Sequence, residues 1–168
     1  RLAVASNKGD LRLFDNQIGK NAKTALPSLG DPIIGVDVSA DGRWVIATCR
    51  TYLLLIDTLI GEGRYQGHLG FDRAFPADSR PLPRRLQLRP HHVAYMDSEV
   101  RFTPAHFNTG SDAETSIVTS TGNYVVSWSF EAVKHGNPYA YVLKRYGGTV
   151  ARDGYTYGSD PVSYTHLP

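Results

Sequence analysis

The chain has 168 residues, of which 41% are hydrophobic and 20% are charged, enough for one globular domain with a core. Its formal net charge of +2 is too small to indicate nucleic-acid binding by itself, and no apolar run approaches the roughly 18 residues that span a bilayer. The single cysteine excludes an internal disulfide and fits a reducing compartment. A content of 16 glycines, 10 prolines and 10 tyrosines favours a turn-rich β protein.

The beginning of the chain predicts a β-hairpin. Residues 1–6 and 11–15 are short runs with apolar residues, and residues 7–10 supply the Asn, Gly and Asp of a turn between them. Asp15 closes the second run. Residues 16–31 should then hold an outer strand and a loop.

Three further apolar runs follow, at residues 33–39, 44–49 and 52–57. The first alternates apolar and polar residues, whereas the other two are rich in β-branched or aromatic residues and nearly free of charge. Asp41 and Gly42 supply the positive φ that a tight turn between the first two runs requires. The sequence therefore predicts a three-stranded meander.

The next part of the chain is less regular. Residues 71–85 are rich in proline and arginine, which predicts a surface loop. Residues 84–89 alternate apolar and polar side chains and predict a new strand. We expect residues 90–92 to form a turn and residues 93–96 to return as a strand.

A second regular region begins near residue 116. Residues 116–120 and 124–130 repeat the strand–turn–strand pattern around a turn at residues 121–123. Residues 131–137 predict a helical turn, and residues 139–146 alternate as an outer strand would.

These units resemble blades of WD-repeat propellers. Residues 2–15 resemble the second and third strands of a blade, with Phe14 where tryptophan is usual, and residues 36–42 resemble a first strand and its turn. The second strands beginning at Leu2 and Trp44 are 42 residues apart, within the roughly 40–45-residue period of such blades. The next second strand begins 72 residues after Trp44, which predicts one blade with a long insertion, near residues 71–112.

The sequence also shows a more specific resemblance, to one family. It resembles the C-terminal domain of the vacuolar import and degradation protein twenty-seven family, whose plant members are called defective-embryo-and-meristems proteins. The resemblance covers about residues 1–160, and the strings that carry it are residues 9–15, 18–27, 30–58, 75–79, 93–96 and 115–122. The resemblance implies an all-β fold: part of a WD-repeat-like propeller with four-stranded antiparallel blades and no catalytic site.

We therefore expect residues 1–160 to be a partial propeller domain with about three to four blades' worth of chain. A closed propeller needs roughly 4–8 blades, so the chain is expected to be a fragment. Residues 151–158 predict another hairpin. Residues 161–168 depart from the family pattern and are expected to be a non-native tail.

The residues that could support chemistry are scattered. Histidines 68, 91, 92 and 106 and Cys49 lack the short paired spacing of zinc ligands. The sequence contains no G-x-S-x-G element and no phosphate-binding glycine loop. We expect no enzyme activity, metal or cofactor. Structural roles are instead predicted for five residues at strand ends, turns and buried strands: Asp15, Gly42, Trp44, Asp57 and Trp128.

One basic run has two interpretations. Residues 80–92 contain Arg80, Arg84, Arg85 and Arg89 and no acidic residue. These arginines could bind an acidic or phosphorylated partner through paired guanidinium hydrogen bonds. The simpler interpretation, which we favour, is a solvated loop and strand edge.

The function that the sequence favours is a protein–protein interaction scaffold, because propellers present loops on a rigid platform. The resemblance implies a role in vacuolar import and degradation, and in plants in embryo and meristem development. The resemblance also implies a Ran-type small GTPase as a partner. It further implies that the protein is located in the cytoplasm, with the nucleus as a second compartment. Two alternatives remain: an enzyme with its active site at a propeller mouth, and a module that binds nucleic acid through the basic run. The sequence offers no sign of a membrane partner.

Overall fold

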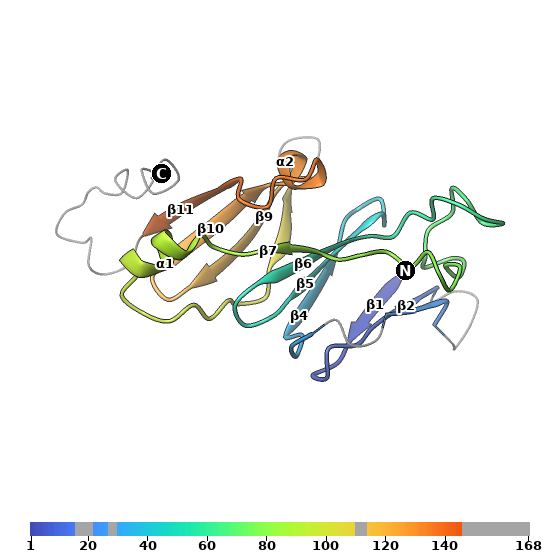
Figure 1. Cartoon of the computed structure of the whole chain (residues 1–168), viewed down its shortest axis with the longest axis horizontal. Helices are drawn as coiled ribbons and strands as arrows, with labels where there is room; N and C mark the ends of the chain where they lie inside the picture. The colour runs from blue at the N-terminus through green and yellow to red at the C-terminus, as the bar shows by residue number, and fades with distance from the viewer. Residues whose placement is uncertain (16–21, 27–29, 110–113, 146–168) are drawn as a thin grey trace.

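The structure is a computed structural model that describes residues 1–15, 22–26, 30–109 and 114–145, which form three antiparallel sheets (Figure 1). The first sheet contains β1 (Leu2–Ala5), β2 (Leu11–Phe14) and β3 (Thr24–Leu26). The second contains β4 (Gly35–Val38), β5 (Trp44–Thr48), β6 (Leu53–Asp57) and β7 (Arg84–Leu86). The third contains β8 (His106–Thr109), β9 (Glu114–Thr121), β10 (Tyr124–Ser129) and β11 (Tyr141–Arg145). Two short helices, α1 (Pro90–Tyr95) and α2 (Phe130–Lys134), complete the described elements.

Within each sheet the strands are neighbours in the order in which they occur along the chain. Short connections of two to five residues join β1 to β2, β4 to β5, β5 to β6 and β9 to β10, and a short connection brings an antiparallel strand back beside its predecessor. Trp44 thus lies opposite Asp57 in the β5–β6 pair, and Tyr124 lies opposite Thr121 in the β10–β9 pair. The predicted all-β fold with four-stranded antiparallel blades is confirmed.

The sheets pack against one another as successive blades do. β4, the first strand of the second sheet, contacts both β1 and β8. β5 and β6 are buried on both faces, which explains their continuous apolar sequence. Trp44 and Ile46 of β5 face the third sheet, whereas Val45, between them in the sequence, faces the first sheet.

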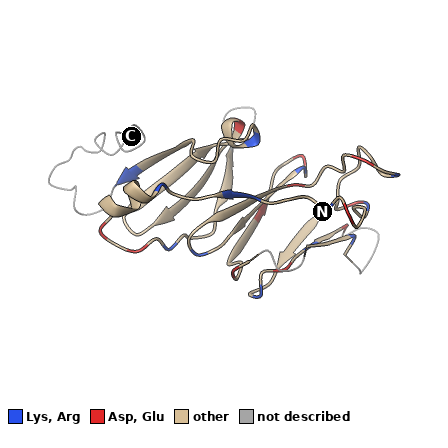
Figure 2. Ribbon diagram, viewed as in Figure 1, with Lys and Arg blue, Asp and Glu red and all other residues tan. Residues whose placement is uncertain are grey.

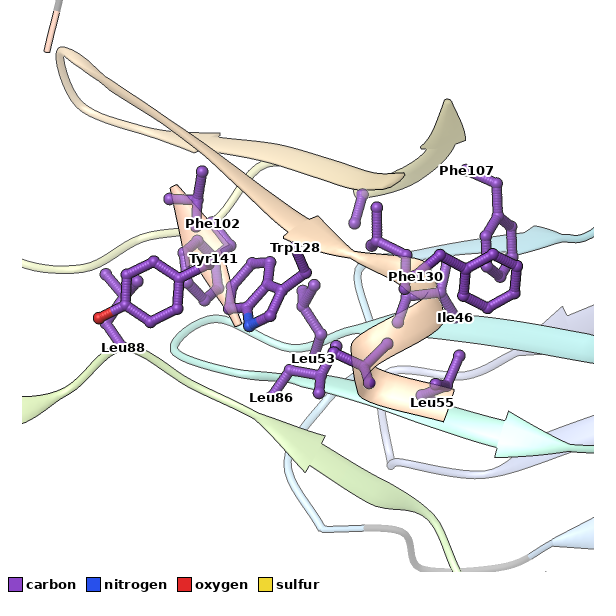
Figure 3. Packing of buried hydrophobic residues seen from close by; sticks show 14 of the residues in the cluster. Ile46, Leu53, Leu55, Leu86, Leu88, Phe102, Phe107, Trp128, Phe130 and Tyr141 are labelled. Carbon is purple, nitrogen blue, oxygen red and sulfur yellow. The ribbon is translucent and has the colours of Figure 1, made fainter. Parts of the chain in front are cut away.

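The larger hydrophobic cluster fills the space between the second and third sheets (Figure 3). Phe130, from the first turn of α2, packs edge-on against Trp44 with ring centroids 6.0 Å apart and lies beside Phe107 at 5.1 Å. Trp128 lies between Phe102 and Tyr141 at 6.1 and 5.5 Å. Aromatic side chains therefore join the two sheets into one body.

One predicted element is wrong. Residues 90–95 form α1, not a turn followed by a returning strand. Pro90 occupies the first turn of the helix, where its missing N–H has no intrahelical partner to lose. His92 is buried, and Val93 and Met96 pack against the main cluster. Residues 93–96 are four hydrophobic residues, and so short a run does not distinguish a strand from one helical face.

Two further expectations correspond to elements of the structure. The outer strand expected within residues 16–31 is β3, and the helical turn expected at residues 131–137 corresponds to α2. Residues 71–112 include β7, α1 and β8, together with two long connections. The predicted hairpin at residues 151–158 and the tail lie outside the described residues. In the part of the chain that the structure describes, no helix is long and apolar enough to cross a membrane.

Candidate functional site

Asp57, at the end of β6, makes hydrogen bonds to the β4–β5 turn and to the segment that follows β6. Its carboxylate accepts hydrogen bonds from Arg43 Nε at 3.0 Å and Arg43 Nη2 at 2.9 Å. It also accepts the backbone N–H of Leu59 at 3.0 Å, where the chain leaves the sheet. Asp15 follows β2 at the corresponding place in the first sheet and is half-buried. The contacts of Asp57 are those of a residue that holds a strand end in place.

The other three residues predicted to be structural occupy a turn and the core. Gly42 has a φ of 79° in the β4–β5 turn. Trp44 is 5% exposed, and Trp128 is completely buried. The indole N–H of Trp128 donates to the carbonyl of Pro138 at 3.0 Å, so its one polar atom is satisfied inside the core.

The arginines of the basic run do not converge on one point. Arg80 is exposed in the loop before β7. The guanidinium carbon of Arg84 lies 5.4 Å from the centre of the Trp44 ring. The corresponding distances are 3.9 Å from Arg85 to Tyr52 and 4.3 Å from Arg89 to Tyr139. Because neighbouring residues of a strand point to opposite faces, Arg84 and Arg85 stack on rings on opposite sides of β7.

These stacked arginines differ from the arginines of the chain that form ion pairs. Carboxylates pair with five arginines elsewhere: Arg1, Arg43, Arg50, Arg101 and Arg145. Within the described ranges no carboxylate lies in ion-pair distance of Arg84, Arg85 or Arg89. A guanidinium that stacks on a ring by its face still presents its N–H groups along its edge. The rim of the second sheet therefore carries fixed positive charge that is not neutralised locally.

Arg84 also lies at a groove between β7 and α2, with a volume of about 490 Å³. Its Nη1 donates to the carbonyl of Val133 at 3.3 Å and, through a very short contact, to the carbonyl of Lys134. These carbonyls belong to the C-terminal end of α2, where a cation is favoured. The groove is lined by Arg84, Arg85, Leu86, Val133, Lys134, His135, Gly136 and Pro138. Figure 2 shows β7 as a blue, basic stretch of the ribbon.

Sequence reasoning missed the α2 side of this groove. Lys134 and His135 lie within the helical turn predicted at residues 131–137, but nothing in the local pattern indicates that this turn lies beside β7. Their proximity results from the packing of the second sheet against the third, a long-range contact that strand periodicity does not encode. A signal does exist in Phe130 and Val133, whose spacing of three residues places two apolar side chains on one face of a helix and indicates that α2 packs into a core.

His92 and Cys49 are buried, whereas His68 and His106 are exposed. His92 is 1% exposed in α1, and its Nδ1 makes a short hydrogen bond with the hydroxyl of Tyr141. Burial raises the pKa of Tyr141, whose hydroxyl also accepts the backbone N–H of Arg89 at 3.0 Å. Cys49 is completely buried, and burial raises the pKa of its thiol, which disfavours the reactive thiolate. Among the described residues, no group of three or more potential ligands could hold a metal ion.

Comparison with known proteins agrees with this architecture. The VID27 C-terminal WD40-like domain family matches residues 1–163. A protein named Vacuolar import and degradation protein 27 from Schizosaccharomyces pombe is 55% identical over 172 aligned positions, which cover 99% of this chain. A protein of the same name from Saccharomyces cerevisiae is 43% identical over 167 positions, which cover 95% of this chain. The match spans 21% of the length of each relative. The chain belongs to the family of VID27 C-terminal WD40-like domains.

Proposed function

We propose that this chain is a non-catalytic protein-binding scaffold within a protein of vacuolar import and degradation. The observation that carries the proposal is the groove between β7 and α2, whose cationic lining is fixed by ring stacking and backbone hydrogen bonds. A fixed, open and charged surface suits recognition of a partner. The names of the two relatives supply the process.

The finer parts of the proposal concern partner and place. A Ran-type small GTPase is the first partner to test, because the family resemblance implies it. The cytoplasm is the proposed compartment, with the nucleus second, and a fluorescent fusion imaged in living cells would locate it. In a plant, we propose that the same scaffold serves embryo and meristem development.

Affinity purification of the tagged full chain tests the scaffold function. We expect a reproducible set of co-purifying proteins that is absent from a purification with the tag alone. A Ran-type GTPase loaded with GDP or with a GTP analogue should be added separately, to test that partner directly. The proposal would be contradicted if the full chain were purified in a folded state and no specific protein co-purified with it.

A further inference from the structure

We propose that the groove between β7 and α2 binds an extended, acidic segment of a partner protein. The inference rests on the proposed scaffold function and specifies the chemistry of its partner. It draws together side chains from two elements: Arg84 and Arg85 from β7, and Lys134 and His135 from the end of α2.

The charged and titratable residues that line the groove are all basic. Two arginines, a lysine and a histidine line the groove, and none of its lining residues is acidic. Arg84 is held by the Trp44 ring and by two carbonyl groups, so little side-chain entropy is lost when an acidic group binds beside it. Its planar guanidinium has five N–H donors, which can bind a carboxylate through two parallel hydrogen bonds.

Glu131 lies just outside the lining, and Asp57 and Glu62 line a neighbouring groove that Arg84 also lines. Glu131 Oε2 lies 3.1 Å from Lys134 Nζ, and Glu131 Oε1 lies 3.5 Å from His135 Nδ1. Its side chain is 72% exposed, so these pairs are weak in water. An acidic partner would compete with Glu131 for Lys134, and removal of the Glu131 charge should therefore favour the partner.

The shape of the groove favours an extended peptide. Leu86 and Val133 are buried beneath it and provide an apolar floor. β7 is the last strand of its sheet, so within the described residues its outer edge has no strand beside it. An added peptide strand can use such an edge for backbone hydrogen bonds while its side chains reach the floor and the charges. Gly136 has open space where a side chain would be, which leaves room at the end of the groove.

The same features argue against nucleic acid. Single-stranded nucleic acid binds where bases stack on exposed aromatic rings along a long basic track. The rings at this rim are occupied by guanidinium groups, and Trp44 and Tyr52 are buried. Single-stranded DNA is therefore a competitor in the test and not the expected ligand.

The test uses the full chain and a fluorescent peptide of alternating Glu and Thr, with binding measured by anisotropy. Lys134→Gln should weaken binding by roughly five- to tenfold. Lys144→Gln is the matched control, because Lys144 is exposed on β11 and lies outside the groove lining. Arg84→Lys, which keeps the charge but loses the forked donors, should weaken binding by about tenfold. Arg12→Lys on β2, also exposed, controls for that change.

Glu131→Gln provides a result that misfolding cannot imitate. It should tighten binding of the acidic peptide by about two- to fivefold. A peptide with Gln in place of Glu should not bind. Equal effects of Lys134→Gln and Lys144→Gln, no gain from Glu131→Gln, or preferential binding of single-stranded DNA would each overturn the inference. If the peptide fails but specific proteins still co-purify with the chain, the groove assignment is wrong and the scaffold function stands.

Discussion

Gly42 shows how one backbone conformation fixes a turn. Its φ of 79° lies where residues with a side chain are strained, and an added Cβ would come within 2.8 Å of Arg1 Nη1. Gly42→Val should therefore lower the free energy of unfolding by about 1–2 kcal/mol, measured by urea denaturation of the full chain. Gly61→Val is the control, because Gly61 has open space around it and no positive φ. An unchanged midpoint for Gly42→Val would contradict this explanation of the turn.

Asp41, in the same turn, should make stability depend on pH. Burial acts to raise the pKa of its carboxyl, but hydrogen bonds from the Ser39 hydroxyl at 2.6 Å and the Arg43 backbone N–H at 3.0 Å outweigh it. The pKa in the folded state is thus lower than normal. Such a group stabilises the fold above its unfolded pKa of about 3.9, and this contribution is lost as pH falls from there toward the folded pKa.

Urea denaturation at neutral pH and at about pH 3 measures this effect. Asp41→Asn should be less stable than the original chain at neutral pH, and the difference should shrink in acid. Ser39→Ala removes the hydroxyl that donates to Asp41. The free energy of unfolding of this variant should therefore change less between neutral pH and about pH 3 than that of the original chain. A difference between Asp41→Asn and the original chain that stays constant with pH would count against the lowered pKa.

Among the elements, α1 depends on a single hydroxyl. Tyr141 on β11 accepts the N–H of Arg89 at 3.0 Å and meets His92 Nδ1, so it anchors both the start of the helix and its buried histidine. Tyr141→Phe leaves these partners without the hydroxyl and should cost about 1–3 kcal/mol. Amide hydrogen exchange should accelerate in residues 89–95 more than in α2. Tyr139→Phe, which keeps the ring beneath Arg89, is the matched control, and equal acceleration in both variants would contradict the anchor.

The elements also show what sequence patterns can and cannot provide. The β4–β6 meander and the β9–β10 hairpin follow from apolar runs separated by Gly-containing turns, which are local signals. α1 was missed because its buried residues face a core built from distant strands. The basic run was recognised, but the rings beneath Arg84 and Arg85 depend on strand pairing within the second sheet. The α2 side of the groove depends on how two sheets pack. Local periodicity predicts strands, whereas surfaces that span two sheets require the tertiary structure.

At the scale of the molecule, polar side chains, one buried and one half-buried, join the second and third sheets. Asp37 Oδ2 on β4 accepts the N–H of Phe107 on β8 at 2.9 Å. The Thr48 hydroxyl on β5 accepts the N–H of Ala105 at 2.8 Å. Since buried hydrogen bonds are costly to leave unmade, these contacts and the aromatic cluster should make the two sheets unfold together. The groove between β7 and α2 is thereby held at a fixed width.

The opposite flank of the molecule is different. Among the strands that the structure describes, β1 is at the edge of the first sheet, and its Leu2 and Val4 side chains are 48% and 45% exposed. An exposed edge with apolar side chains promotes strand pairing between molecules. We therefore expect the 168-residue chain expressed alone to be marginally stable and to self-associate. Size-exclusion chromatography with light scattering measures this directly.

Substitution identifies the surface responsible for association. Leu2→Lys combined with Val4→Lys places charge on the β1 edge and should reduce association, because charged edges resist pairing. Ile34→Lys is the control, since Ile34 is 49% exposed but lies outside β1. If Ile34→Lys reduces association as much as the double variant, general apolar exposure is responsible and not the β1 edge. If the original chain is monodisperse and unfolds in a single sharp transition, the expectation is wrong. The three sheets would then be stable without a partner on the exposed side of β1.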